Sequence, residues 1–339
     1  MKPIWSEGRS RFVAYLAFVA ALAVVLSGVP AMRPVLGGSD VVPGLKVAFI
    51  GDQGLGPDSE AVLSLIKREG AAMVLHSGDF DYADNPAAWD AQINKVLGPS
   101  FPYFVSVGNH DEQMWPEYQR LAVERLARVN GAQCAGDYGV QAACTYQGLF
   151  FVLSGVGTIG RNGHAAYISE QLAADSSTWS ICSWHKDQHD MQVGSKHNET
   201  GWDVYQACQN GGAIVATAHE HSYSRTLTLT DVGNRRAGHG ATGRPDVMEV
   251  SPGRTFVFVS GLGGDSKRDF DNRHLGDTWW ATYYTATRYL LNGALVPAFD
   301  YDFGALFITF NVDGDPRKAR GEFKNIGDQT IDMFEIHAF

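Results

Sequence analysis

The chain has 339 residues, of which 45% are hydrophobic and 19% are charged, so it can bury a large core. Its 27 lysine and arginine residues are outnumbered by 37 aspartate and glutamate residues, which gives a net charge of −10. No basic run follows the N-terminal region, which argues against a nucleic-acid-binding face. We expect one large domain, alone or with a small appendage.

The N-terminus has the layout of an export signal. Basic residues precede an unbroken apolar run from Phe12 to Leu26, and small residues follow it. The length of the segment 12–29 fits either a cleaved signal peptide or a retained membrane anchor. We therefore expect residues 1–44 to form this segment and a linker, and the protein to be secreted, periplasmic or anchored in the membrane.

The rest of the chain, residues 45–339, is predicted to form one α/β domain. Short apolar runs that end in glycine or polar residues predict buried strands. Helical patterns at Ser59–Glu69 and Ala87–Leu97 separate the first three runs, which indicates βαβ units, a parallel sheet and loops at its C-terminal edge. The predicted strands are Leu45–Ile50, Ala72–Leu75, Tyr103–Val107, Leu149–Leu153, Ser180–Trp184, Ala213–Ala218, Thr255–Val259, Ala305–Phe310, Arg320–Lys324 and Thr330–Ile336.

The later part of the chain contains two segments without clear periodicity. Residues 231–246 and 261–297 are rich in glycine and aromatic residues, and we predict long loops that face the substrate. The last strands are predicted to form hairpins, one of them with a turn at Asp313-Gly314.

Four cysteines fit an oxidising compartment. Cys134 and Cys144 flank a glycine-containing loop that a disulfide bond would close. Cys182 lies in a predicted strand and Cys208 in a predicted helix, and we expect both to be buried free thiols. The absence of Cys-x-x-Cys spacing argues against a structural zinc site.

Side chains that can bind metal ions follow the predicted strands. An isolated aspartate after a strand is more often a helix cap than a ligand. Carboxylates and imidazoles gathered at one sheet edge, however, suit iron, manganese or zinc. The residues at these strand ends are Asp52, Asp79, Asn109, His110, His185, His219 and His221.

The motifs around these residues carry a family resemblance. They read GDQG at 51–54, GDFDY at 78–82, GNHD at 108–111, WH at 184–185 and AHEH at 218–221. Together they resemble the calcineurin-like metallophosphoesterase superfamily, and within it the purple acid phosphatases.

Two positions favour the purple acid phosphatase branch. Gly54 stands where the wider superfamily usually carries a histidine ligand, and Tyr82 stands where purple acid phosphatases place a phenolate. A phenolate suits Fe(III), whose charge would deprotonate Tyr82 far below its ordinary pKa of about 10. Ala218 departs from the glycine usual at that position and adds a methyl group near the metal loops.

The resemblance implies a four-layer αββα sandwich, in which two mixed β-sheets are flanked by helices. It also implies a pair of metal ions, Fe(III) with Fe, Zn or Mn, which hydrolyses a phosphate-ester substrate of the monoester class. A phosphodiesterase or nucleotidase of the same fold, and a non-catalytic exported binding protein, remain alternatives. The sequence leaves the oligomeric state open.

The resemblance also assigns roles to single residues. His110 would contact the phosphate or protonate the leaving oxygen, and Asp111 would orient the His110 ring. His189 or His197 would supply a further phosphate contact, and Arg225 would either extend the last motif or pair with a carboxylate. One metal ion would be held by Asp52, Asp79, Tyr82 and His221, and the other by Asp79, Asn109, His185 and His219.

Overall fold

The computed structural model describes residues 41–159, 162–236, 238–291, 294–297 and 301–339. The predicted signal or anchor at residues 12–29 lies outside these ranges. Within them, every helix falls short of the length and apolar character that a membrane crossing needs.

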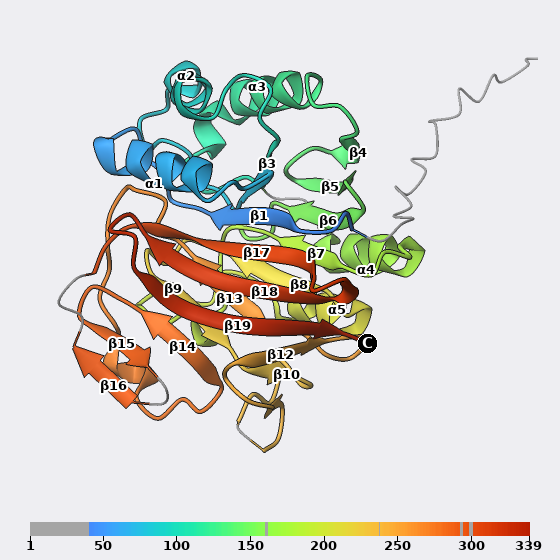
Figure 1. The fold of residues 1–339 in the computed structure, drawn as a ribbon, viewed down its shortest axis with the longest axis vertical. Helices are drawn as coiled ribbons and strands as arrows, with labels where there is room; N and C mark the ends of the chain where they lie inside the picture. The colour runs from blue at the N-terminus through green and yellow to red at the C-terminus, as the bar shows by residue number, and fades with distance from the viewer. Residues whose placement is uncertain (1–40, 160–161, 237, 292–293, 298–300) are drawn as a thin grey trace, which may run out of the picture. The chain divides into compact units, whose positions relative to one another are not determined.

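Two large mixed β-sheets form the centre of the described domain, and a two-stranded ribbon lies beside them (Figure 1). The first sheet has the order β12 (Val247–Val250), β19 (Thr330–Ala338), β18 (Asp315–Asn325), β17 (Gly304–Val312), β1 (Leu45–Ile50), β2 (Met73–His76) and β3 (Tyr103–Val105). The second sheet has the order β16 (Ala294–Pro297), β15 (Arg288–Leu291), β14 (Trp280–Tyr284), β9 (Tyr223–Thr226), β13 (Val257–Ser260), β8 (Ile214–Thr217), β7 (Ser180–Ser183), β6 (Leu149–Ser154), β5 (Gln141–Tyr146) and β4 (Gln133–Asp137). The ribbon pairs β10 (Thr228–Leu229) with β11 (Ala241–Thr242).

Helices flank part of each sheet (Figure 1). Helices α1 to α3 pack beside the first sheet, and α4 and α5 pack beside the second. The described helices are α1 (Pro57–Arg68), α2 (Pro86–Val96), α3 (Trp115–Leu126), α4 (His164–Ala174) and α5 (Trp202–Gly211), and the short 3₁₀ helices are η1 (Glu112–Met114), η2 (His189–Met191) and η3 (Asn272–His274). The predicted αββα sandwich is therefore confirmed.

Local signals explain where the first helices begin. Helix α1 has Pro57 in its first turn, where a missing N–H group costs nothing. Its last turn contains the basic residues Lys67 and Arg68, whose positive charges interact favourably with the negative end of the helix dipole. Helix α2 begins after Asn85, whose side chain accepts a hydrogen bond from the N–H of Ala88 at 3.1 Å. Both helices therefore start directly after the loops that follow β1 and β2.

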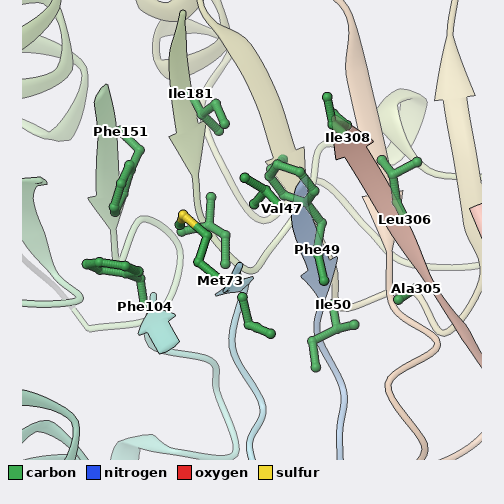
Figure 2. Packing of buried hydrophobic residues seen from close by; sticks show 14 of the residues in the cluster. Val47, Phe49, Ile50, Met73, Phe104, Phe151, Ile181, Ala305, Leu306 and Ile308 are labelled. Atoms are coloured by element: carbon green, nitrogen blue, oxygen red, sulfur yellow. The ribbon is translucent and has the colours of Figure 1, made fainter. Parts of the chain in front are cut away.

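Apolar side chains of the two sheets meet between them (Figure 2). Phe104 of β3 contacts Phe151 of β6 edge-to-face, with ring centroids 4.7 Å apart. Phe49 of β1 contacts Phe258 of β13 in the same way at 5.1 Å. These contacts hold the two sheets face to face, so that loops from both meet at one edge.

The segment 261–297 differs from its prediction as a long loop. It contains β14, β15 and β16, which extend the second sheet beyond β9. The pairing of β14 with β9 shifts register between Trp280 and Thr282, and this irregularity interrupts the alternation by which a strand is predicted from sequence.

Two disulfide bonds join the four cysteines. Cys134 and Cys144 face each other across β4 and β5 and form the predicted bond. The prediction of free thiols at Cys182 and Cys208 is wrong, because these residues form a second bond that ties β7 to α5. Their separation of 26 residues gives no local signal, and only the packing of α5 on the sheet brings the two sulfur atoms together.

Candidate metal centre

The predicted ligands come from loops that follow parallel strands of both sheets. Strands β1, β2 and β3 are parallel neighbours in the first sheet, and β7 and β8 are parallel neighbours in the second. Backbone hydrogen bonds tie the loops together, from the N–H of Gln53 to the carbonyl of Asp79 at 2.9 Å and from Ala218 to His185 at 3.2 Å. The polar side chains at these strand ends are thereby brought to one place.

A first donor cluster consists of Asp52, Tyr82 and His221. The Tyr82 hydroxyl donates a hydrogen bond to Oδ1 of Asp52 at 2.8 Å and lies 3.1 Å from Nε2 of His221. The same Nε2 lies 3.2 Å from Asp52 Oδ1. Three donor atoms from both sheets thus face one point, as ligands of a single cation do.

A second donor cluster consists of Asp79, His185 and His219, whose donor atoms all lie within 4.8 Å of one another. Nε2 of His185 is 3.1 Å from Asp79 Oδ2 and 3.0 Å from Nδ1 of His219. The other ring nitrogen of His185 bonds the carbonyl of Ser77 at 2.8 Å, which fixes the ring with Nε2 inward.

The two clusters adjoin each other. The backbone N–H of His219, in the second cluster, donates to Oδ2 of Asp52, in the first, at 2.9 Å. Asp79 bonds the first cluster's loop through its carbonyl, as described above. The two clusters therefore belong to one candidate site.

The amide oxygen of Asn109 tests whether these residues fit metal ions. This Oδ1 atom is buried and has no hydrogen-bond partner among the described residues. A buried amide oxygen without a partner is costly unless something else satisfies it. A cation beside it would do so, and Asn109 is one of the predicted ligands.

Unusual backbone conformations mark the same loops. Asp52, Asp79, Tyr82 and His219 all have positive φ angles, between 56° and 66°. Residues other than glycine rarely adopt this left-handed region, and such strain concentrates at functional sites. Four of the seven predicted ligands therefore occupy a conformation that the surrounding structure must impose.

Burial and neighbouring charges set the protonation of the donor side chains. Burial raises the pKa of Asp52, but attraction and a hydrogen bond from His221 outweigh it and hold that pKa well below its usual range. Burial, followed by the charges of Asp52 and Asp79, raises the pKa of Tyr82 well above its ordinary value. Tyr82 therefore stays protonated and donates a hydrogen bond to Asp52. Metal binding would have to release the Tyr82 proton.

His110 and Asp111 lie differently from each other. His110 is exposed, and its ring packs on Tyr82 with centroids 4.5 Å apart, while its backbone N–H bonds Oδ1 of Asp79 at 2.9 Å. The buried carboxylate of Asp111 instead accepts hydrogen bonds from the backbone N–H groups of Asp79, Phe80 and Gly108 at 2.7–3.0 Å. Asp111 thus supports the two loops that carry Asp79 and Asn109. We had expected Asp111 to orient the His110 ring, but its hydrogen bonds go to the loop backbone instead.

The other predicted residues are not gathered in the clusters. Nδ1 of His189 bonds the carbonyl of Lys196 at 2.8 Å, and His197 is exposed. Arg225 is buried and forms a bidentate ion pair with Asp332 at 2.8 and 2.9 Å. Of the two roles predicted for Arg225, the structure therefore shows the pairing with a carboxylate.

The sequence profile of the family described as calcineurin-like phosphoesterase matches residues 45–223, more than half of the chain. The chain belongs to the calcineurin-like phosphoesterase family. The matched range contains every predicted ligand from Asp52 to His221, and the predicted resemblance is thereby confirmed. No curated protein matches the chain.

Solved structures resemble this calcineurin-like phosphoesterase over most of its length. A purple acid phosphatase, PPD1 from yellow lupin (Lupinus luteus) seeds, is 19% identical, covers 90% of this chain and 55% of its own, and has a TM-score of 0.61. PhoD is 12% identical, with coverages of 88% and 69% and a TM-score of 0.51. GAP50, the anchor in the inner membrane complex of Plasmodium, is 12% identical, with coverages of 88% and 90% and a TM-score of 0.51. The chain spans about half the length of the lupin phosphatase, and at these identities the likeness shows a shared fold.

Two residues of the candidate site had no signal in the sequence. Glu199 accepts a hydrogen bond from Nε2 of His219 at 2.7 Å and pairs with Lys186 at 3.1 Å. Ser266, in the segment predicted to be a loop, bonds Nδ1 of His221 at 2.5 Å. Each fixes the outer nitrogen of a predicted ligand, and no motif spacing identifies such supporting residues.

Proposed function

We propose that this chain is a dinuclear metal-dependent phosphoesterase that hydrolyses phosphate monoesters. The observation that supports it most is the adjacency of the two donor clusters, joined by the hydrogen bond from His219 to Asp52. When bound, a pair of cations would lower the pKa of attacking water and neutralise charge on the phosphate oxygens. The mixture of carboxylate, phenol and imidazole donors suits Fe(III) with Fe, Zn or Mn.

The proposed ligands divide between the two clusters. Asp79 is proposed as the bridging ligand, because its carboxylate lies in the second cluster and its carbonyl bonds the loop of the first. Asn109 is assigned to the second cation on account of its unpartnered oxygen. The first cation would be held by Asp52, Asp79, Tyr82 and His221, and the second by Asp79, Asn109, His185 and His219.

His110 is proposed as the residue that contacts the phosphate and protonates the leaving oxygen. Its exposed ring can reach a substrate, and its contact with Tyr82 keeps it beside the donors. The hydrogen bond from its backbone N–H to Asp79 holds the His110 backbone beside the second cluster. The role requires only an imidazole nitrogen that faces the bound ester.

The two disulfide bonds support a further proposal, that the protein is exported. Disulfide bonds persist mainly in oxidising compartments. Residues 1–44 would then be a signal or anchor with a linker, and residues 45–339 the catalytic domain.

Phosphate release from p-nitrophenyl phosphate by the metal-loaded protein tests the proposed reaction. We expect turnover that chelation abolishes, and a loss of about 100-fold or more in kcat for His110→Ala. The exposed His239→Ala variant is the control and should retain activity. Faster hydrolysis of bis-p-nitrophenyl phosphate than of the monoester would assign the site to diesters, and no hydrolysis of either ester would overturn the proposal.

A further inference from the structure

Lys196 brings a positive charge to the second donor cluster. It lies between η2 and α5, and its Nζ atom is 3.5 Å from Nδ1 of His219. That ring nitrogen is the one that faces His185, at 3.0 Å, whereas the opposite nitrogen bonds Glu199. The ammonium group therefore stands on the inner side of the His219 ring, where a metal ion and its substrate would lie.

The backbone around Lys196 is held in place by several hydrogen bonds. The Lys196 carbonyl accepts from Nδ1 of His189 at 2.8 Å and from Nε2 of Gln192 at 3.2 Å. Nearby, the Gly194 carbonyl bonds Nε2 of His274 at 3.2 Å. These bonds hold the backbone of Lys196 in place, and the His189 ring contributes to them through Nδ1.

The ammonium group of Lys196 has no anionic partner within ion-pair distance among the described residues. Lys196 is nevertheless partly buried. Burial and the nearby charge of Arg268 lower the pKa of Lys196, while Asp52, Glu220 and Glu199 raise it. A partly buried cation is stabilised by an anion, and the bound phosphate would supply one.

We propose that Lys196 binds a non-bridging phosphate oxygen of the substrate and makes the site selective for dianionic phosphate monoesters over diesters. The inference rests on the proposed function, because it places the ester on the two clusters. A monoester carries close to two negative charges at neutral pH, whereas a diester carries one and replaces an oxygen anion with a bulky group. An added cation therefore favours the monoester more than the diester. Lys196 thus takes the role that the sequence had assigned to His189 or His197.

The test compares two esters in three variants. Lys196→Gln removes the charge, Lys196→Arg keeps it, and Lys318→Gln removes a lysine away from the site, whose ion pairs are with Asp313 and Glu335. For Lys196→Gln we expect kcat/KM to fall about 10- to 100-fold for p-nitrophenyl phosphate but less than about 3-fold for bis-p-nitrophenyl phosphate. Lys196→Arg should restore most of the monoester rate, and Lys318→Gln should match wild type.

Two further measurements separate the inference from the proposed function. Metal analysis should find equal metal contents in wild type and Lys196→Gln, and calorimetry on the metal-loaded proteins should show inorganic phosphate binding at least about 10-fold more weakly in the variant. Equal losses on both esters, a loss of metal, or unchanged phosphate affinity would each overturn the role of Lys196. If wild type hydrolyses neither ester, the proposed function fails, and the phosphate affinities still decide whether Lys196 binds the anion.

Discussion

The phenol of Tyr82 donates a hydrogen bond to Oδ1 of Asp52 over a distance of 2.8 Å. Asp52 follows β1 and Tyr82 follows β2, and the parallel pairing of these strands brings the two loops together. The same carboxylate oxygen lies 3.2 Å from His221, which follows β8 of the other sheet. A proton now lies between Tyr82 and Asp52, and a cation bound there would replace it.

Replacing Tyr82 with phenylalanine should remove the colour of an iron-loaded protein. If Tyr82 binds Fe(III) as a phenolate, the wild-type protein shows a tyrosinate-to-iron charge-transfer band in the visible range, and Tyr82→Phe loses it. The measurement is a visible spectrum together with metal analysis. Tyr301→Phe is the control and should keep the colour, because the Tyr301 hydroxyl donates a hydrogen bond to the backbone carbonyl of His221, at 3.0 Å, and is not a proposed ligand. An active wild-type protein free of iron and of colour would contradict this prediction.

Removing the proposed bridging ligand should affect both metal ions. We expect wild type to bind about two metal ions per chain and Asp79→Ala to bind fewer than one, because both donor sets lose an oxygen. Chelation should lower the unfolding midpoint of wild type, since ligands that bind the folded state stabilise it, and should leave Asp79→Ala unchanged. Exposed Glu170→Ala on α4 should behave as wild type. Full metal content in Asp79→Ala would exclude a bridging role.

Breaking the buried ion pair between Arg225 and Asp332 should destabilise the fold. Arg225 also stacks on Phe334, with its guanidinium carbon 3.8 Å from the ring centroid. Arg225→Met would leave the Asp332 carboxylate buried without its cation, and we expect a loss of about 3–5 kcal/mol in the free energy of unfolding. The double variant Arg225→Met/Asp332→Leu should lose less than the sum of the single changes, as urea unfolding would measure. A single-variant loss below about 1 kcal/mol would mean that the pair is not a main support of the fold.

The two disulfide bonds should contribute unequally to stability. Cys182 and Cys208 are 26 residues apart, whereas Cys134 and Cys144 are 10 apart. Because a longer closed loop restricts the unfolded chain more, Cys182→Ala/Cys208→Ala should cost about 3–4 kcal/mol and the other pair about 2–3 kcal/mol. Thermal unfolding of both double variants provides the comparison. The reverse order would show that effects on the folded state outweigh the loop entropy.

The ionisation of Glu69 should make the free energy of unfolding depend on pH. Burial raises the pKa of Glu69, but hydrogen bonds and attraction from Lys324 and Lys46 outweigh it and lower the pKa below its ordinary value. The ionised carboxylate therefore stabilises the folded state above the ordinary glutamate pKa of about 4.3, and this contribution is lost as the pH falls through the lower folded value.

Glu69→Gln should thus lower the free energy of unfolding by about 1 kcal/mol at neutral pH, since the ion pairs are partly open to water. The difference from wild type should be constant above about pH 5 and should shrink below about pH 4. Glu60→Gln is the control and should change the stability less, because Glu60 pairs with the exposed Lys95, at 2.7 Å, where water screens the charges. A difference between wild type and Glu69→Gln that persists unchanged at pH 3 would contradict the assignment.

Most of the sheet framework could be predicted from local patterns. The strands β1, β2, β3, β7 and β8 lie within two or three residues of their predicted bounds, because each is a short apolar run ended by glycine or a polar loop. Strands β14 to β16 could not be predicted, since β14 is irregular and all three gain stability only by pairing beyond β9. Only β14 pairs with a strand distant in sequence, β9, and β15 and β16 then add to it as hairpins. The tertiary fold, rather than local propensity, therefore decides this extension of the sheet.

The family and the chemical types of the donors follow from short motifs, because a strand, a loop and a polar residue are adjacent in the chain and need no distant partner to be read. Other contacts depend instead on how the layers pack. Examples are those of Lys196 and Glu199 with the His219 ring, and that of Arg225 with Asp332. Each of these contacts joins segments on different elements, and the balance of burial and charge that brings them within hydrogen-bond distance exists only in the folded chain.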